Sequence, residues 1–347
     1  FPKTRLRRPR MQGWSRELLT QHRLNPSDLI LPIFIQEGAK TEVPIASLPG
    51  VSRITLDILL DKAKAAYDNG IRAIALFPHI DPALKSPLGD EALFEKNLVC
   101  RAIHAVKNAV PDLGIIADVA LDPYTSHGQD GIVENGKILN DATLEKLCEQ
   151  ALVMAKAGCD IVAPSDMMDG RIGAIRETLE DHNFHDTMIL AYSAKYASNM
   201  YAPFRDAVGS GAQLGAANKK TYQMDFAGSS DEAMREIAMD IAEGADMVMV
   251  KPAISYLDII KQATTTFPVP IFAYQVSGEY AMIKAAAKNG WIDGDAVMLE
   301  QLISIKRAGA RAICAKAGPD SSNAKAVQRY VTIQRIANSR IRRCRLG

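Results

Sequence analysis

Residues 188–195 read MILAYSAK and residues 245–251 read ADMVMVK, so two short apolar runs end in lysine, at Lys195 and Lys251. Runs of this kind are typical of strands in a parallel sheet that is covered on both faces. An ammonium group is costly to bury without a partner, so a lysine at the end of a buried strand tends to lose its proton. A neutral lysine amine attacks ketones to form a Schiff base. Two such lysines indicate an enzyme that handles two carbonyl substrates, or one substrate twice.

Similar apolar runs recur along the chain and predict its fold. They lie at residues 29–35, 71–77, 114–121, 160–164, 270–276 and 312–315, and with the two quoted runs they make eight. Amphipathic helix patterns lie between them, at residues 56–69, 92–109, 142–157, 231–243, 279–288 and 295–308. Strands that alternate with helices predict a parallel sheet, and eight such units predict a closed (β/α)8 TIM barrel. A doubly wound sheet is the alternative, but no GxGxxG motif follows the first run.

The chain is predicted to have three parts. Residues 1–28 form an N-terminal arm with one short helix near residues 15–21, residues 29–317 form the barrel, and residues 318–347 form an atypical basic tail. Because the arm lacks a core pattern, we expect it to make subunit contacts in a homo-oligomer. Residues 209–217 are rich in small side chains and follow the fifth predicted strand, so they would lie over the barrel mouth as a lid.

The composition argues against several classes of partner. Lys+Arg 41 against Asp+Glu 40 gives a net charge of +1, which offers no bulk attraction to nucleic acid or to an acidic membrane. The basic ends, at residues 3–10 and 340–345, have no interleaved aromatic residues for stacking on bases. No apolar stretch approaches the ~20 residues that span a bilayer. The cysteines show no CxxC pair or metal-ligand spacing, so we expect a soluble protein of the reducing cytoplasm.

Polar residues gather where the predicted strands end, which is the catalytic face of a barrel. Two cations, Arg205 and Lys219, border the small-residue stretch, and this favours a clamp on a substrate carboxylate over isolated surface charges. The pairs Ser277 with Glu279 and Asp166 with Asp169 are also signals for the start of the helices that follow. That interpretation is compatible with a role in the site.

Six motifs carry a resemblance to a known family. They are DVALDPY (118–124), SDMMDGRIG (165–173), SAKYAS (193–198), TYQMD (221–225), MVKPA (249–253) and YQVSGEY (274–280). Together they resemble the porphobilinogen synthase (5-aminolevulinate dehydratase) family over residues 5–311. The resemblance implies a lyase of porphyrin and haem biosynthesis. In that family two 5-aminolevulinate molecules condense to porphobilinogen with loss of two waters.

The resemblance also implies roles for single residues. Lys251 would form a Schiff base with the substrate that supplies the propionate side (the P site), and Lys195 with the substrate that supplies the acetate side (the A site). Arg205 and Lys219 would hold the A-site carboxylate, and Ser277 the P-site carboxylate. Further residues would line or support the site: Asp118, Ser165, Tyr201, Gln223 and Tyr274. Two ammonium groups that lie close together lower each other's pKa, which keeps at least one amine nucleophilic near neutral pH.

The expected metal follows from the same resemblance. Zinc-dependent members carry three cysteines after the third strand, and here Ala120, Asp122 and Asp130 stand in those places. Carboxylates suit magnesium or no metal, so no catalytic zinc is expected. Whether Asp122 and Asp130 bind a metal ion or act on substrate amino groups is left open. Glu236 matches the glutamate that holds an allosteric magnesium ion in many bacterial members, and the family commonly forms homo-octamers.

The chain departs from the family pattern after the eighth strand. Lys316 stands where the family has a tyrosine that helps to hold the P-site carboxylate, and the tail to Gly347 has no family counterpart. A catalytically impaired family member is therefore one alternative function. The other is a class I aldolase or lyase that uses a single Schiff-base lysine.

Overall fold

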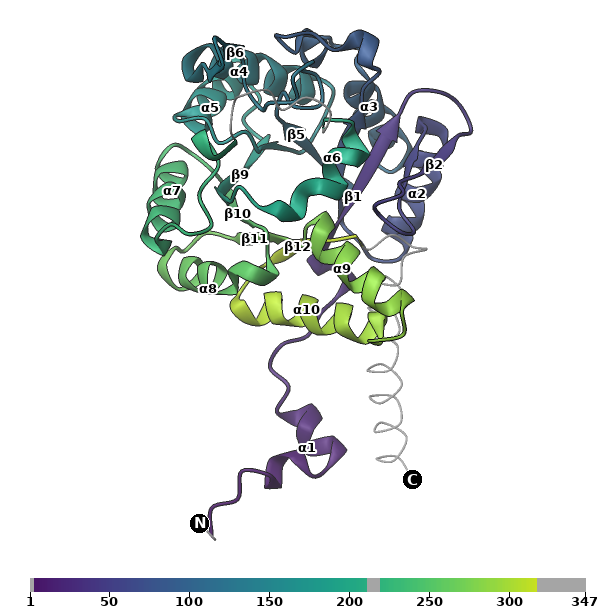
Figure 1. Ribbon diagram of the computed structural model, residues 1–347, viewed down its shortest axis with the longest axis vertical. Helices are drawn as coiled ribbons and strands as arrows, with labels where there is room; N and C mark the ends of the chain where they lie inside the picture. Colours follow the sequence, from purple (N-terminus) through teal and green to yellow (C-terminus); the bar gives the residue numbers. More distant parts are fainter. Residues whose placement is uncertain (1–2, 211–218, 317–347) are drawn as a thin grey trace.

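The computed structural model describes residues 3–210 and 219–316, and their strands close into a parallel barrel (Figure 1). In barrel order the strands are β1 (Leu29–Gln36), β4 (Ala73–His79), β5 (Gly114–Val119), β8 (Ile161–Pro164), β9 (Met188–Lys195), β10 (Met247–Lys251), β11 (Ile271–Tyr274) and β12 (Ala312–Cys314). Pairing of β12 with β1, where Ile313 lies opposite Leu29, closes the ring. All eight predicted runs are barrel strands, so the predicted (β/α)8 barrel is confirmed.

Helices surround this barrel (Figure 1). They are α2 (Leu56–Asp68), α3 (Leu98–Ala109), α4 (Asn140–Lys156), α5 (Arg171–Asp181), α6 (Ala202–Val208), α7 (Ser230–Ala242), α8 (Leu257–Thr266), α9 (Ser277–Lys288) and α10 (Gly294–Ala308). The helix predicted at residues 92–109 starts later, at Leu98, because the Asn97 side chain accepts a hydrogen bond from the Cys100 N–H and caps it there. The start signal at Asp166 and Asp169 precedes α5, for which no range was predicted, and helices α6 and α8 were not predicted.

Short elements complete the described part of the chain. Strands β2 (Glu42–Pro44) and β3 (Ser52–Ile54) form an antiparallel pair beside β1, and β6 (Val133–Glu134) pairs with β7 (Lys137–Ile138). The 3-10 helices are Arg8–Arg10, Pro26–Asp28, Pro82–Leu84, Asp90–Leu93, Asn199–Tyr201, Lys219–Thr221 and Ile254–Tyr256. Helix α1 (Gly13–Leu18) forms in the arm, slightly before its predicted place, and lies away from the barrel (Figure 1).

Two predicted segments fall largely outside the described residues. The whole of the basic tail at 318–347 lies outside them. Most of the stretch at 209–217 that was predicted as a lid also lies outside them. The division into arm, barrel and tail therefore stays a prediction. No helix in the described ranges is long and apolar enough to span a bilayer.

The barrel core explains why the strand sequences are apolar throughout. Every residue of β10 is buried, as are residues 189–195 of β9, because helices cover one face and the barrel interior the other. A strand of this kind leaves its last residue at the barrel mouth. In β9 and β10 that residue is a lysine.

Candidate active site

The strand register places the two lysines side by side. Lys195 of β9 lies opposite Lys251 of β10, after an irregularity in the pairing between Val248 and Val250. Neighbouring strands lie ~4.8 Å apart, so the two side chains enter the same small volume at the mouth. Both are buried. The two amines therefore form one site.

Aromatic rings surround the amine of Lys251. Its Nζ lies 4.8 Å from the ring centre of Tyr274, 5.1 Å from that of Tyr192, and 5.2 Å from those of Tyr201 and Phe204. Burial, followed by the charge of Lys195, lowers the pKa of Lys251 to about 8 against the opposing effect of nearby carboxylates. The amine of Lys251 is consequently neutral in part near physiological pH.

Lys195 has a more polar environment. Its Nζ donates hydrogen bonds to the Ser165 carbonyl oxygen and to Asp130 Oδ1, the latter at 3.3 Å. Asp130 Oδ2 also accepts from Lys219 Nζ at 2.5 Å and from the Tyr222 hydroxyl at 2.6 Å. Burial alone would raise the pKa of Asp130, but the charges of Lys195 and Lys219 outweigh it and hold this pKa well below its usual range. Asp130 is therefore an ionised bridge between the two lysines that contact it.

Two further carboxyl groups differ from Asp130 in their proton affinity. Burial raises the pKa of Asp118 to about 7, although Lys251 opposes the shift. Burial and the charge of Asp130 likewise raise the pKa of Asp122. A carboxyl group with a pKa near neutrality exchanges protons readily at physiological pH, so Asp118 is the better proton carrier of the site.

A narrow cavity of about 30 Å³ joins these groups at the barrel mouth. Its lining is Asp118, Asp122, Asp130, Ser165, Lys195, Tyr201, Phe204, Arg205, Lys219, Gln223 and Lys251. Ten of these eleven residues were predicted from the sequence, and the exception is Phe204. The predicted Tyr274 contacts Lys251 through its ring. The predicted Ser277 is not among the lining residues, and its Oγ accepts a hydrogen bond from the Phe204 N–H at 3.0 Å.

Sequence reasoning missed three aromatic residues of the site. Tyr192 and Phe204 contact the amine of Lys251, and Tyr222 binds Asp130. Tyr192 lies within a strand, where an aromatic residue is normally part of the core, so no signal distinguished it. The other two are the sequence neighbours of predicted residues, Phe204 of Arg205 and Tyr222 of Gln223. That proximity was the available signal.

The predicted metal residue lies outside this cavity. Glu236 lines a separate hollow of about 320 Å³, together with Glu232, Asp169 and Asn140. Burial raises the pKa of Glu236, although Arg171 opposes the shift, and the neighbouring carboxylates raise it further. Within residues 3–210 and 219–316, no group of three or more His, Cys, Asp or Glu side chains is arranged to hold a metal ion. A cation at Glu236 would therefore rely on water for most of its ligands, as magnesium commonly does.

Lys316 follows β12 at the same end of the barrel. It is buried, and its Nζ lies 3.7 Å from the ring centre of Phe34. Burial lowers the pKa of Lys316 to about 7, and the charge of Lys251 contributes. The ring of Phe34 also contacts that of Phe204, which lies beside Lys251, so aromatic contacts connect Lys316 with the site.

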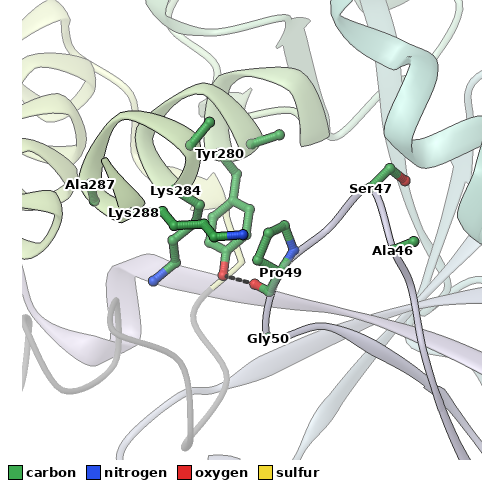
Figure 2. Close-up of a pocket in the computed structure, with 10 residues that line it drawn as sticks. Ala46, Ser47, Pro49, Gly50, Tyr280, Lys284, Ala287 and Lys288 are labelled. Carbon is green, nitrogen blue, oxygen red and sulfur yellow. Dashed lines mark hydrogen bonds between the residues drawn. The ribbon is translucent and has the colours of Figure 1, made fainter. Parts of the chain in front are cut away.

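A larger hollow, of about 670 Å³, lies on the outside of the barrel between α9 and residues 46–50. Figure 2 shows Lys284 and Lys288 beside the ring of Tyr280, whose hydroxyl donates a hydrogen bond to the Pro49 carbonyl oxygen at 2.8 Å. The residues that line it include none of the predicted site residues. The chemistry of the site therefore belongs to the smaller cavity.

Comparison with known proteins agrees with this geometry. The family model for delta-aminolevulinic acid dehydratase matches residues 3–323. The chain belongs to the delta-aminolevulinic acid dehydratase family. It is 52% identical to the delta-aminolevulinic acid dehydratase of Bradyrhizobium diazoefficiens, over 92% of this chain and 90% of that protein. It is 51% identical to the Rhodobacter capsulatus enzyme, over 89% of this chain and 92% of that one.

A solved structure of the same family is also similar. The Toxoplasma gondii delta-aminolevulinic acid dehydratase (porphobilinogen synthase), in complex with the reaction product porphobilinogen, superposes with a TM-score of 0.89 at 48% identity. The match covers 92% of this chain and 90% of that chain. The comparisons support the family predicted from the six motifs and do not support either alternative function.

Proposed function

We propose that this chain is a porphobilinogen synthase, which condenses two molecules of 5-aminolevulinate to porphobilinogen with loss of two waters. Family membership supports the reaction. The observation that carries the mechanism is the register of Lys195 opposite Lys251 at the barrel mouth. Two adjacent amines match a reaction that joins two ketones.

Lys251 is the amine better prepared to react first. Its lowered pKa leaves a neutral fraction that attacks the ketone carbon, and the resulting carbinolamine loses water to give an iminium ion. The four surrounding rings stabilise that cation through their faces and shield it from water. Asp118, with its pKa of about 7, is suited to carry the protons of these steps.

Lys195 is the proposed partner amine for the second substrate. Its Nζ is held by hydrogen bonds to Asp130 and to the Ser165 carbonyl oxygen. Arg205 and Lys219 line the same cavity and are the proposed ligands of that substrate's carboxylate. Lys219 donates to Asp130 through one of the three N–H groups of its ammonium, so it can bind the substrate carboxylate beside Asp130.

The other substrate carboxylate is assigned to Ser277. Its hydroxyl donates to the Met200 carbonyl oxygen at 3.3 Å and can turn toward a ligand. Tyr201, Gln223, Tyr274 and Ser165 are proposed as supporting residues, and Asp122 and Asp130 as groups that face the substrate amino groups. The positions of the cavity-lining side chains and of the Tyr274 ring beside the two lysines support these proposed roles.

For the metal, we propose an allosteric magnesium ion at Glu236 and no catalytic zinc. The carboxylate-rich hollow around Glu236 suits a hard cation that keeps most of its water. Where zinc-dependent members have cysteines, Asp122 and Asp130 offer oxygen instead of sulfur.

We further propose a homo-oligomer, with the octamer as its expected size, in the cytoplasm. The arm carries exposed apolar side chains, including Trp14 at 67% and Leu18 at 75% exposure, which a neighbouring subunit would cover. The four cysteines that the structure describes are free thiols, as suits a reducing compartment.

The experiment that tests the function is a turnover assay with 5-aminolevulinate in the presence of chelator, magnesium or zinc. We expect porphobilinogen to form, magnesium to stimulate the rate and zinc to have no stimulating effect. Failure to form porphobilinogen under any of these conditions would contradict the proposed reaction. Stimulation by zinc alone would contradict the proposed metal.

A further inference from the structure

The start of helix α9 contains a buried carboxylate whose contacts go beyond the helix-start signal predicted from the sequence. Glu279 is 2% exposed. Its Oε2 accepts a hydrogen bond from the Val276 N–H at 2.7 Å, and its Oε1 accepts one from the Ile254 N–H at 2.6 Å. The N–H groups of Ala253 and Ser255 also face this carboxylate. One side chain therefore binds two separate segments of backbone.

The first of these segments is the one that follows Lys251. Residues 253–255 begin the 3-10 helix Ile254–Tyr256, whose first N–H groups have no partner within the helix. Glu279 provides that partner, and it reaches a backbone position three residues beyond Lys251. Burial raises the pKa of Glu279 to about 7, although the N–H donors oppose this shift by stabilising its charge. The hydrogen bonds are thus strongest when Glu279 is ionised.

The second segment, the start of α9 itself, is bound tightly to the other side of the site. Ser277 accepts from the Phe204 N–H and donates to the Met200 carbonyl oxygen. A Cβ atom on Gly278 would lie 2.6 Å from the Met200 carbonyl oxygen, so only glycine allows this close approach.

A further hydrogen bond joins the two sides. The single proton of the Tyr201 hydroxyl faces two carbonyl oxygens, that of Tyr196 at 2.6 Å and that of Lys251 at 3.2 Å. The contacts form a closed circuit that runs from Lys251 through Glu279 to Ser277, and back through residues 200–204 to Lys251. Glu279 is the one ionisable side chain in this circuit that contacts neither the cavity nor its lining amines.

We propose that Glu279 is a positioning residue, which fixes the backbone of Lys251 relative to Ser277. Glu279 thereby holds the Lys251 amine within its four aromatic rings. It also fixes the distance between Lys251 and Ser277, the two proposed ends of one substrate's binding site. The inference rests on the proposed Schiff-base role of Lys251. A displacement of about 1 Å in a reacting group is enough to lower a rate by orders of magnitude.

The test compares Glu279→Gln with a matched control, Tyr280→Phe. The glutamine keeps the size of the side chain but places an NH₂ group against a backbone N–H, so one hydrogen bond is lost. Tyr280 is the next residue on α9, and its hydrogen bond to Pro49 faces the outer hollow (Figure 2). Both variants lose a hydrogen bond of α9, but Glu279→Gln alone alters the group that joins α9 to the Lys251 segment.

The readout is the rate at which cyanoborohydride traps levulinate on Lys251, measured across pH by peptide mass spectrometry. For Glu279→Gln we expect trapping at pH 7 to be at least about tenfold slower. We also expect the pH midpoint to move upward, because a less confined amine is better hydrated. Tyr280→Phe should match the wild type, and Glu279→Asp, which keeps the charge on a shorter side chain, should recover part of the rate.

An unchanged rate and midpoint in a folded Glu279→Gln protein would overturn the positioning role. If that variant does not fold, Glu279→Asp is measured in the same way, and wild-type behaviour there would overturn it equally. An equal loss of rate in Tyr280→Phe would show that trapping depends on the packing of α9 in general, and it would also contradict the positioning role of Glu279. Absence of trapping on Lys251 in the wild type would instead overturn the proposed function of that lysine.

Discussion

The pH dependence of Schiff-base formation should distinguish Lys251 from an ordinary lysine. With a pKa of about 8, the neutral fraction of the Lys251 amine is ~1% at pH 6 and ~90% at pH 9. Trapping on Lys251 should therefore rise by about 90-fold over this range and level off above pH 8. An unperturbed lysine would gain about 1,000-fold over the same range, with no plateau.

The groups that set this midpoint are known from the structure. Burial and the charge of Lys195 lower the pKa of Lys251, while Asp118, Asp122 and Asp130 raise it. The assay follows cyanoborohydride trapping by levulinate, which lacks the amino group of the substrate, so the titration belongs to the protein. A solvent-exposed lysine peptide from the same digest is the internal control. A rate on Lys251 that keeps rising tenfold per pH unit through pH 9 would refute the reasoning.

Three further predictions concern stability and regulation. Asp130→Asn removes the carboxylate that binds both Lys195 and Lys219. It should lower the free energy of unfolding by about 3 kcal/mol, measured by urea denaturation. A loss below about 1 kcal/mol would show that the bridge contributes little. Gly278→Ala should cost about 1–3 kcal/mol by the same measurement because its methyl group meets the Met200 carbonyl oxygen, and unchanged stability would contradict that close approach. Glu236→Gln should remove the stimulation of turnover by magnesium, and stimulation equal to that of the wild type would place the ion elsewhere.

The barrel could be predicted from the sequence because its strands are buried on both faces. In a chain where such runs alternate with amphipathic helices, a continuous run such as MVMVK in β10 is explained by a strand that is buried on both faces. Helix α6 could not be predicted in the same way. It spans seven residues and begins next to a proline, so it is too short to show an apolar period.

The site was predictable to the extent that its residues follow the strand ends. That rule identified Lys195 and Lys251, and their positions side by side follow from the strand register. Of the rings around Lys251, Tyr201 and Tyr274 were predicted from the family resemblance, whereas Tyr192 was not, since it has the pattern of a core residue. Glu279 was interpreted as a helix signal, and it does cap α9 through the Val276 N–H. Its second bond, to the Ile254 N–H, joins residues 25 apart in the chain, which no local pattern reveals.

The most direct test of the central claim is to trap the reaction with 5-aminolevulinate and map the modified peptides. We predict reduced adducts at both Lys251 and Lys195, with Lys251 modified first. Substitution of either lysine by methionine should abolish formation of porphobilinogen. Adducts at neither lysine while porphobilinogen still forms would contradict the account of two adjacent Schiff bases.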